Sequence, residues 1–157
     1  MALDLGPLLH GACQRISPIY PDYATRPIRD GFSWSSSLAG CPFDRLYLVV
    51  FRSVRRPKAD LDLLREHDDR AYAEAIESGG LLRYFKGDAN ERRECLSFCL
   101  WESRERAIEA AGAASHRTAA RISAQMYESY VLDRYWLKKI VTTRGEKLIF
   151  EPIRPDS

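Results

Sequence analysis

The order in which strand-like and helix-like segments alternate between residues 46 and 153 constrains the fold of this chain most strongly. Runs rich in β-branched and aromatic residues, typical of strands, occupy residues 46–54, 81–86, 94–101, 127–140 and 147–153. Apolar residues at helical spacing fill residues 59–78, which a Gly-Gly pair ends, and a segment from Ser103, a suitable capping residue, to about Met126. The first six elements therefore follow each other as β-α-β-β-α-β, and a last strand closes the chain.

This order is that of the ferredoxin-like unit, an antiparallel sheet with both helices on one face, so we predict an α+β domain over residues 46–157. Residues 1–45 carry five of the eight prolines and no sustained periodicity, which predicts an irregular N-terminal arm. The arm is too aromatic for a disordered tail and is expected to pack across the domain. Its aromatic residues include Tyr20, Tyr23, Phe32 and Trp34.

The sheet needs a cover on the face that the two helices leave open. Several strands carry apolar residues on both alternating faces, so each face is expected to be buried. Two covers are compatible with the sequence: the N-terminal arm, or a second copy of the sheet in a homodimer. We favour the second copy, which would make a dimeric α+β barrel.

Charge and composition exclude several classes of partner and cofactor. The 24 basic and 22 acidic residues are intermixed, and the net charge of +2 favours neither nucleic acid nor a membrane surface. The chain lacks a signal-peptide pattern and any apolar run of about 18 residues, so we expect a cytoplasmic protein. It also lacks a P-loop, a dinucleotide GxGxxG and zinc-ligand spacing, so no cofactor or metal is expected. The four cysteines, none in a CxxC pair, are expected to be structural thiols.

Asp68 interrupts the apolar stripe of the first predicted helix. At 100° per residue it falls within about 20° of the direction of that stripe, so its carboxylate faces inward. A charge in that position needs a partner, and Arg52 and Arg83 are the expected ones. Two interpretations stay open: a structural ion pair, or a catalytic or ligand-binding carboxylate.

His116 lies in the second predicted helix, directly after Ser115. If the helix is continuous, His116 is a surface residue well away from the apolar side. If a new helical turn begins at Ser115, the positive end of the helix dipole keeps His116 neutral, as a base or a ligand requires. We take His116 and Asp68 as the catalytic candidates.

Aromatic residues cluster at the end of the third predicted strand and along the fourth. Such residues are either plain core or interface, or the walls of an apolar pocket in which tyrosine hydroxyls orient a planar ligand. The candidate substrate-binding residues are Trp101, Tyr127, Tyr130, Tyr135, Trp34, Arg52 and Arg83.

Residues 46–153 resemble the dimeric α+β-barrel superfamily, which includes antibiotic-biosynthesis monooxygenase-like, haem-degrading and polyketide-cyclase-like proteins. The segments FRSVRRP, EAIESGGLLRYF, CLSFCLWES and YESYVLDRY, with the Ser115-His116-Arg117 step, are also similar to an uncharacterised family of fungi and some bacteria. The resemblance implies an apolar pocket between sheet and helices and a helix-two histidine that acts as a base or binds haem iron. Only His116 matches that role. The asparagine of the haem degraders has no counterpart, because Asn90, the only asparagine, lies in a predicted turn.

The sequence thus supports a cofactor-independent enzyme acting on an apolar, aromatic or polyketide-like small molecule. Cyclisation, dehydration or isomerisation needs only an acid and a base poised in a dry pocket, and cofactor-free oxygenation is a close variant. Two other classes stay open. One is a haem-binding protein with His116 as axial ligand, and the other is a non-catalytic binding or assembly domain.

Overall fold

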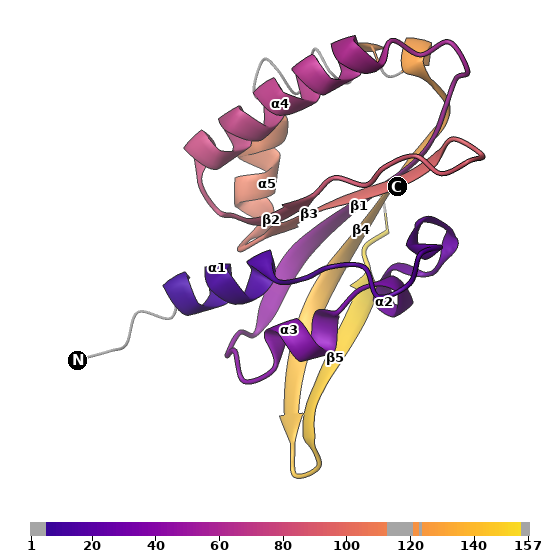
Figure 1. Cartoon of the computed structure of the whole chain (residues 1–157). Helices are drawn as coiled ribbons and strands as arrows, with labels where there is room; N and C mark the ends of the chain where they lie inside the picture. Colours follow the sequence, from indigo (N-terminus) through magenta and orange to yellow (C-terminus); the bar gives the residue numbers. More distant parts are fainter. Residues whose placement is uncertain (1–5, 113–120, 123, 155–157) are drawn as a thin grey trace.

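Five strands form a single antiparallel sheet in the computed structural model, which describes residues 6–112, 121–122 and 124–154 (Figure 1). The strands are β1 (Arg45–Arg55), β2 (Leu81–Phe85), β3 (Glu94–Trp101), β4 (Tyr127–Thr142) and β5 (Gly145–Pro152), and their order across the sheet is β2-β3-β1-β4-β5. Helices α4 (Leu61–Ser78) and α5 (Arg104–Ala111) lie on one face of this sheet (Figure 1). The α+β, ferredoxin-like fold predicted from the sequence is confirmed.

Both helices begin at capping residues. The Asp60 side chain accepts a hydrogen bond from the backbone N–H of Leu63 at the start of α4. Ser103 accepts one from the N–H of Arg106 at the start of α5, as predicted. The rest of the predicted second helix includes residues 113–120 and 123, which lie outside the described residues. No helix within the described ranges is both long and apolar enough to cross a bilayer.

The N-terminal segment covers the sheet face opposite α4 and α5 (Figure 1). The segment predicted to be an irregular arm holds short helices joined by turns: α1 (Gly6–Gln14), η1 (Tyr23–Thr25), α2 (Ile28–Gly31) and α3 (Trp34–Leu38). Its buried residues share one hydrophobic core with the sheet, in which Phe32 and Trp34 pack against Phe98. The arm, and not the favoured second copy, therefore covers this face, while a homodimer stays a prediction.

The side chains of β1 alternate between two hydrophobic cores, one on each face of the sheet. Leu46, Leu48 and Val50 belong to the core beneath the arm. Tyr47 and Val49 belong to a smaller core beneath α4 and α5. Because successive side chains of a strand point to opposite faces, the odd-numbered residues of β1 face the two helices.

Lys139 joins the end of the arm to the β4–β5 hairpin. Its side chain is only 2% exposed, and its Nζ donates to the carbonyl oxygens of Leu38 and Cys41 at 2.5 and 2.6 Å. Glu146 supplies the countercharge at 3.2 Å and also accepts the backbone N–H of Gly40. This buried ammonium thus has a full set of acceptors, as a buried charge requires.

We expect the substitution Lys139→Met to lower the free energy of unfolding by about 2–4 kcal/mol, because Glu146 and two carbonyls lose their shared donor. Urea unfolding measures the change. Lys138→Met is the matched control, since Lys138 pairs with Glu151 on the surface and should cost less than about 1 kcal/mol. Equal losses in the two variants would show that the buried ammonium does not hold the arm.

Candidate functional site

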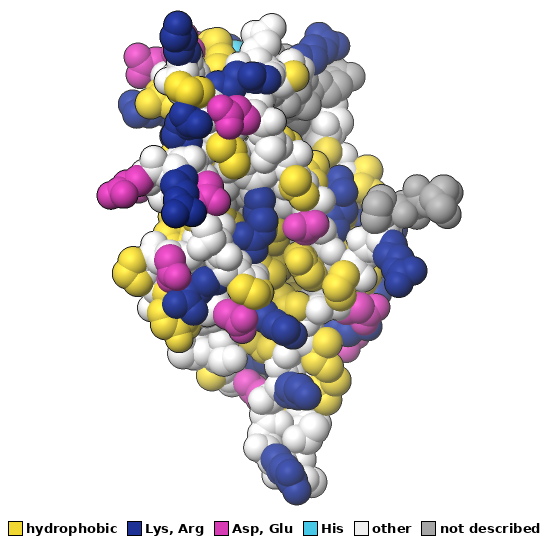
Figure 2. Space-filling view, turned by 90° about the vertical axis from the view of Figure 1, so that its right-hand side faces the viewer, with side chains coloured by type: hydrophobic (Ala, Val, Ile, Leu, Met, Phe, Trp, Pro, Cys, Tyr) yellow, Lys and Arg dark blue, Asp and Glu magenta, His cyan; other side chains and the backbone are white. Residues whose placement is uncertain are grey.

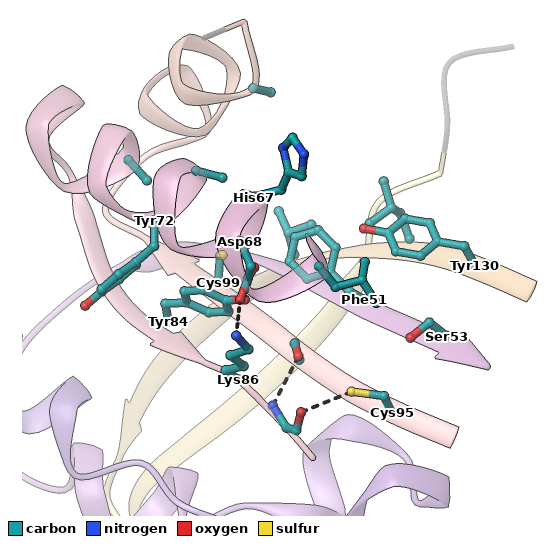
Figure 3. A pocket seen from close by; sticks show the side chains of 18 of the residues that line it. Phe51, Ser53, His67, Asp68, Tyr72, Tyr84, Lys86, Cys95, Cys99 and Tyr130 are labelled. Carbon is teal, nitrogen blue, oxygen red and sulfur yellow. Dashed lines mark hydrogen bonds and ion pairs between the residues drawn. The ribbon is translucent and has the colours of Figure 1, made fainter. Parts of the chain in front are cut away.

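A cavity of about 540 Å³ lies between α4 and the sheet face that carries the odd-numbered residues of β1 (Figure 3). Phe51 and Ser53 of β1 and Cys95 and Cys99 of β3 line its sheet side. Residues of α4 line the opposite side, and most of the wall is apolar or aromatic. The volume falls within the range of about 300–1,000 Å³ that is usual for small-molecule sites.

Asp68 faces this cavity from α4, as the helical periodicity predicted (Figure 3). The hydroxyl of Tyr84 donates to its Oδ1 at 2.6 Å, and the Nζ of Lys86 lies 2.8 Å from its Oδ2. Tyr84 lies near the end of β2, and Lys86 is the residue directly after this strand. Because the two residues are two positions apart, their side chains point to the same face of the sheet. The Asp68 side chain remains 31% exposed, so the carboxylate can still be reached from the cavity.

The partners predicted for Asp68 were wrong. Arg52 lies on the arm side of the sheet and donates to the carbonyls of Ala24 and Arg26 at 2.9 and 2.7 Å. Arg83 also faces the arm, where its Nε and Nη2 donate to the carbonyl of Ile16 at 3.3 and 3.1 Å. Both guanidinium groups hold the arm to the sheet, and neither lines the cavity.

Three of the predicted aromatic residues do line the cavity. Trp101 is buried where β3 ends, and Tyr127 and Tyr130 extend from β4 at the far end. The rings of Tyr127 and Tyr130 lie 5.2 Å apart between centroids. These three residues therefore stay candidates for contact with a ligand.

The other two aromatic candidates lie on the arm side of the sheet. Trp34 is 2% exposed and packs in the core beneath the arm, where its Nε1 donates to the carbonyl of Ile28 at 2.8 Å. Tyr135 pairs with Leu48 across the β1–β4 ladder, which places its side chain on the same face. Neither residue lines the cavity beneath α4.

The hydroxyl and thiol groups around Asp68 are held in their neutral forms. Burial raises the pKa of Tyr84 far above its ordinary value, and the adjacent Asp68 charge raises it further. Burial, together with the same charge, raises the pKa of the Cys99 thiol to about 12. Burial also raises the pKa of Tyr130. These groups are therefore hydrogen-bond donors at neutral pH.

Sequence reasoning missed Tyr84 and Lys86 as the residues that hold Asp68. The signal was available in the LLRYFK segment, where these two residues alternate on one strand face. His67, the residue before Asp68 in α4, also lines the cavity. His116 lies outside the described residues, so its catalytic role and its role as a haem ligand stay predictions.

Metal ligation finds no support in the part of the chain that the structure describes. No group of three or more His, Cys, Asp or Glu side chains is placed there to hold an ion. On the face shown in Figure 2, basic and acidic side chains are interspersed and form no patch of a single sign. The cavity beneath α4, which holds the paired carboxylate of Asp68, is our candidate site.

Comparison with known sequences gives one family and one curated relative. The family described as PB2B2.08-like matches residues 6–149 of the chain. The UPF0643 protein PB2B2.08 of Schizosaccharomyces pombe is 31% identical over 111 residues. That match covers 67% of this chain and 50% of the relative, so the chain spans about half of the length of that relative.

Comparison with solved structures shows the fold. A candidate antibiotic biosynthesis monooxygenase from Nitrosomonas europaea superposes with a TM-score of 0.51 at 11% identity, over 62% of this chain and 92% of the other. Protein SO0527 from Shewanella oneidensis gives 0.52 at 11% identity, over 60% and 92%. Rv0793 from Mycobacterium tuberculosis gives 0.50 at 18% identity, over 57% and 91%. At such identities the likeness concerns the fold alone.

Proposed function

This chain belongs to the PB2B2.08-like family, and we propose that it is a cofactor-independent enzyme that removes a proton from an apolar, aromatic carbon acid. One observation carries the proposal: a carboxylate with both oxygens held by protein groups stands in the wall of a largely apolar cavity. Its two partners offset the cost of placing a charge there, and a carboxylate positioned in the wall of a pocket is a candidate for binding or chemistry. Polyketide-like compounds with an acidic C–H are the substrate class that this cavity suits.

Asp68 is the general base of the proposed reaction. Each carboxylate oxygen has two acceptor positions, so the bonds to Tyr84 and Lys86 leave positions open toward the cavity. The substrate C–H bond breaks, the proton goes to Asp68, and the electron pair remains on the substrate as an enolate. Lys86 then supplies the positive charge that favours this anion in a partly water-excluded site.

The enolate can follow several courses, which the fold alone does not separate. Reprotonation at another carbon gives isomerisation, and loss of a β-hydroxyl group gives dehydration. Attack on a carbonyl within the same molecule gives cyclisation. Reaction with O2 gives oxygenation, and the likeness in fold to candidate monooxygenases supports including this course. His116 is proposed as a second proton-transfer group.

Anthrone is a suitable probe, because it is planar and apolar and has acidic hydrogens at C10. Under nitrogen in D2O, the protein is expected to accelerate exchange of those hydrogens above the background given by acetate and phenol at matching concentrations. Proton NMR follows the exchange. Under air, O2 uptake reports oxygenation, in which anthrone and O2 give anthraquinone and water.

The outcomes separate the functional classes. Exchange without O2 uptake supports the isomerase, dehydratase and cyclase class, and exchange with O2 uptake supports the oxygenase. Binding of anthrone without any exchange contradicts the enzyme and favours a non-catalytic binding domain. A protein that does not bind anthrone at all contradicts the proposed substrate class.

A further inference from the structure

The cavity beneath α4 carries more positive than negative side chains. Its basic lining residues are Arg55, Arg65, Lys86 and Arg134, and its acidic ones are Asp68 and Asp88. Among the residues that the structure describes, only Lys86 of the four basic residues has an acidic partner, and that partner is Asp68. The charges of Asp68 and Lys86 thus neutralise each other, whereas Arg55, Arg65 and Arg134 form no ion pair with another described residue.

Arg55 is the least satisfied of these groups. It follows Ser53 on β1, and its backbone is fixed by the bond from its N–H to the carbonyl of Arg93 at 2.9 Å. Its Nε is buried and has no acceptor within the described part of the protein. A buried donor without an acceptor costs free energy, so an acceptor supplied by a ligand would be favoured.

The Arg55 charge acts on the far end of the cavity, where Tyr127 and Cys95 lie. Burial raises the pKa of both groups, and the Arg55 guanidinium partly offsets that rise in each. The Asp68 charge, in contrast, raises the pKa of both Tyr127 and Cys95. The cavity therefore has an ion-paired carboxylate at Asp68 and, at Arg55, a positive charge with an unused buried donor.

We propose that Arg55 binds a carboxylate group of the ligand, so that the substrates of this pocket are apolar aromatic acids. This inference rests on the proposed function and names its substrate class. A guanidinium presents planar, parallel N–H donors that match the two oxygens of a carboxylate. The neutral hydroxyl of Tyr127 is a further donor in the same part of the cavity.

The charges along the cavity also set the orientation of such a ligand. Arg55 attracts a carboxylate, whereas the charge of Lys86 is already matched by Asp68, so the acidic group of the ligand lies at the Tyr127 end. The carbon acid is then left at the Asp68 end, where the proposed base stands. In this orientation, contacts with the aromatic walls and with the guanidinium both contribute to the binding free energy of the ligand.

Two probes that differ in one group test the inference: anthracene-9-carboxylate and the neutral anthracene-9-methanol. Ligand fluorescence measures the two dissociation constants with the folded chain of 157 residues. We expect the carboxylate to bind at least about tenfold more tightly than the alcohol, because a hydrogen bond to a charged group contributes more than a neutral one.

Substitution of Arg55 assigns the preference to this residue. Arg55→Gln should reduce the preference to within about twofold, with binding of the alcohol unchanged, and Arg55→Lys should retain part of it. Arg144→Gln removes the same charge from the exposed β4–β5 turn and should keep the full preference. Matched urea midpoints show that the variants are folded.

Failure of this inference and failure of the proposed function would give different results. If the wild-type chain binds the alcohol but shows no preference for the carboxylate, the inference is overturned and the proposed function stands. The same holds if Arg55→Gln keeps the preference. If neither probe binds, the pocket is not a site for aromatic molecules and the proposed function fails with it.

Discussion

The variant Asp68→Asn is expected to exchange the C10 hydrogens of anthrone at least about a hundredfold more slowly than the wild-type chain, because a positioned general base contributes about 10²–10⁴-fold. Asparagine has the same shape, and its carbonyl oxygen can still accept the hydrogen bond from Tyr84. The amide takes up no proton at neutral pH, so the proposed base is lost together with the ion pair to Lys86. Proton NMR in D2O under nitrogen gives both rates.

Asp69→Asn is the matched control for this variant. Asp69 is the next residue of α4 and is exposed, so the change removes the same charge from the same helix without altering the cavity wall. Its exchange rate should equal that of the wild-type chain. The dissociation constant of anthracene-9-methanol should be similar in all three proteins, which shows that binding is retained.

A second substitution separates the two proposed proton-transfer groups. If Asp68→Asn exchanges anthrone at the wild-type rate, Asp68 is a structural ion-pair partner and not the base. His116→Ala, measured in parallel, then decides whether the histidine takes that role. Loss of rate in both variants assigns the reaction to an acid and a base acting together.

The sheet and its two helices could be predicted from the sequence, because their periodic patterns are strong and capping or turn residues mark their ends. The predicted β3 coincides with Glu94–Trp101, and α4 ends where Gly79 adopts a φ of +87°. The inward direction of Asp68 follows from helical geometry alone. The short helices of the arm could not be predicted, since 4 to 9 residues give too few turns for a periodic pattern.

The partners of Asp68 could not be assigned because they depend on which strand face meets the helices. β1 is apolar on both faces, so its sequence does not show whether Arg52 faces the helices or the arm. In β2 a register shift between Leu81 and Arg83 places Arg83 on the same side as Leu82. Simple alternation from Leu82 would put Arg83 toward α4.

Trp34→Ala is expected to lower the free energy of unfolding by about 3–5 kcal/mol, the largest loss of stability that we expect from a single substitution in this chain. The Trp34 ring lies 5.0 Å from that of Phe98 and 5.3 Å from that of Phe150, between centroids, in the core that joins arm and sheet. Alanine leaves a cavity there and removes the indole donor from the carbonyl of Ile28. Urea unfolding, with the fluorescence of the remaining tryptophans as the signal, measures the change.

This substitution also decides whether Trp34 has the substrate-binding role that its aromatic character suggested. Because Trp34 lies across the sheet from the cavity, a variant that is still folded should bind anthracene-9-methanol with an unchanged dissociation constant. Trp34→Phe keeps most of the ring and provides a folded sample if alanine does not. Tyr20→Ala, in an exposed part of the same arm, should cost less than about 1 kcal/mol. Weakened binding with wild-type stability would contradict this structural role, because a residue that only fills the core beneath the arm must lose stability first.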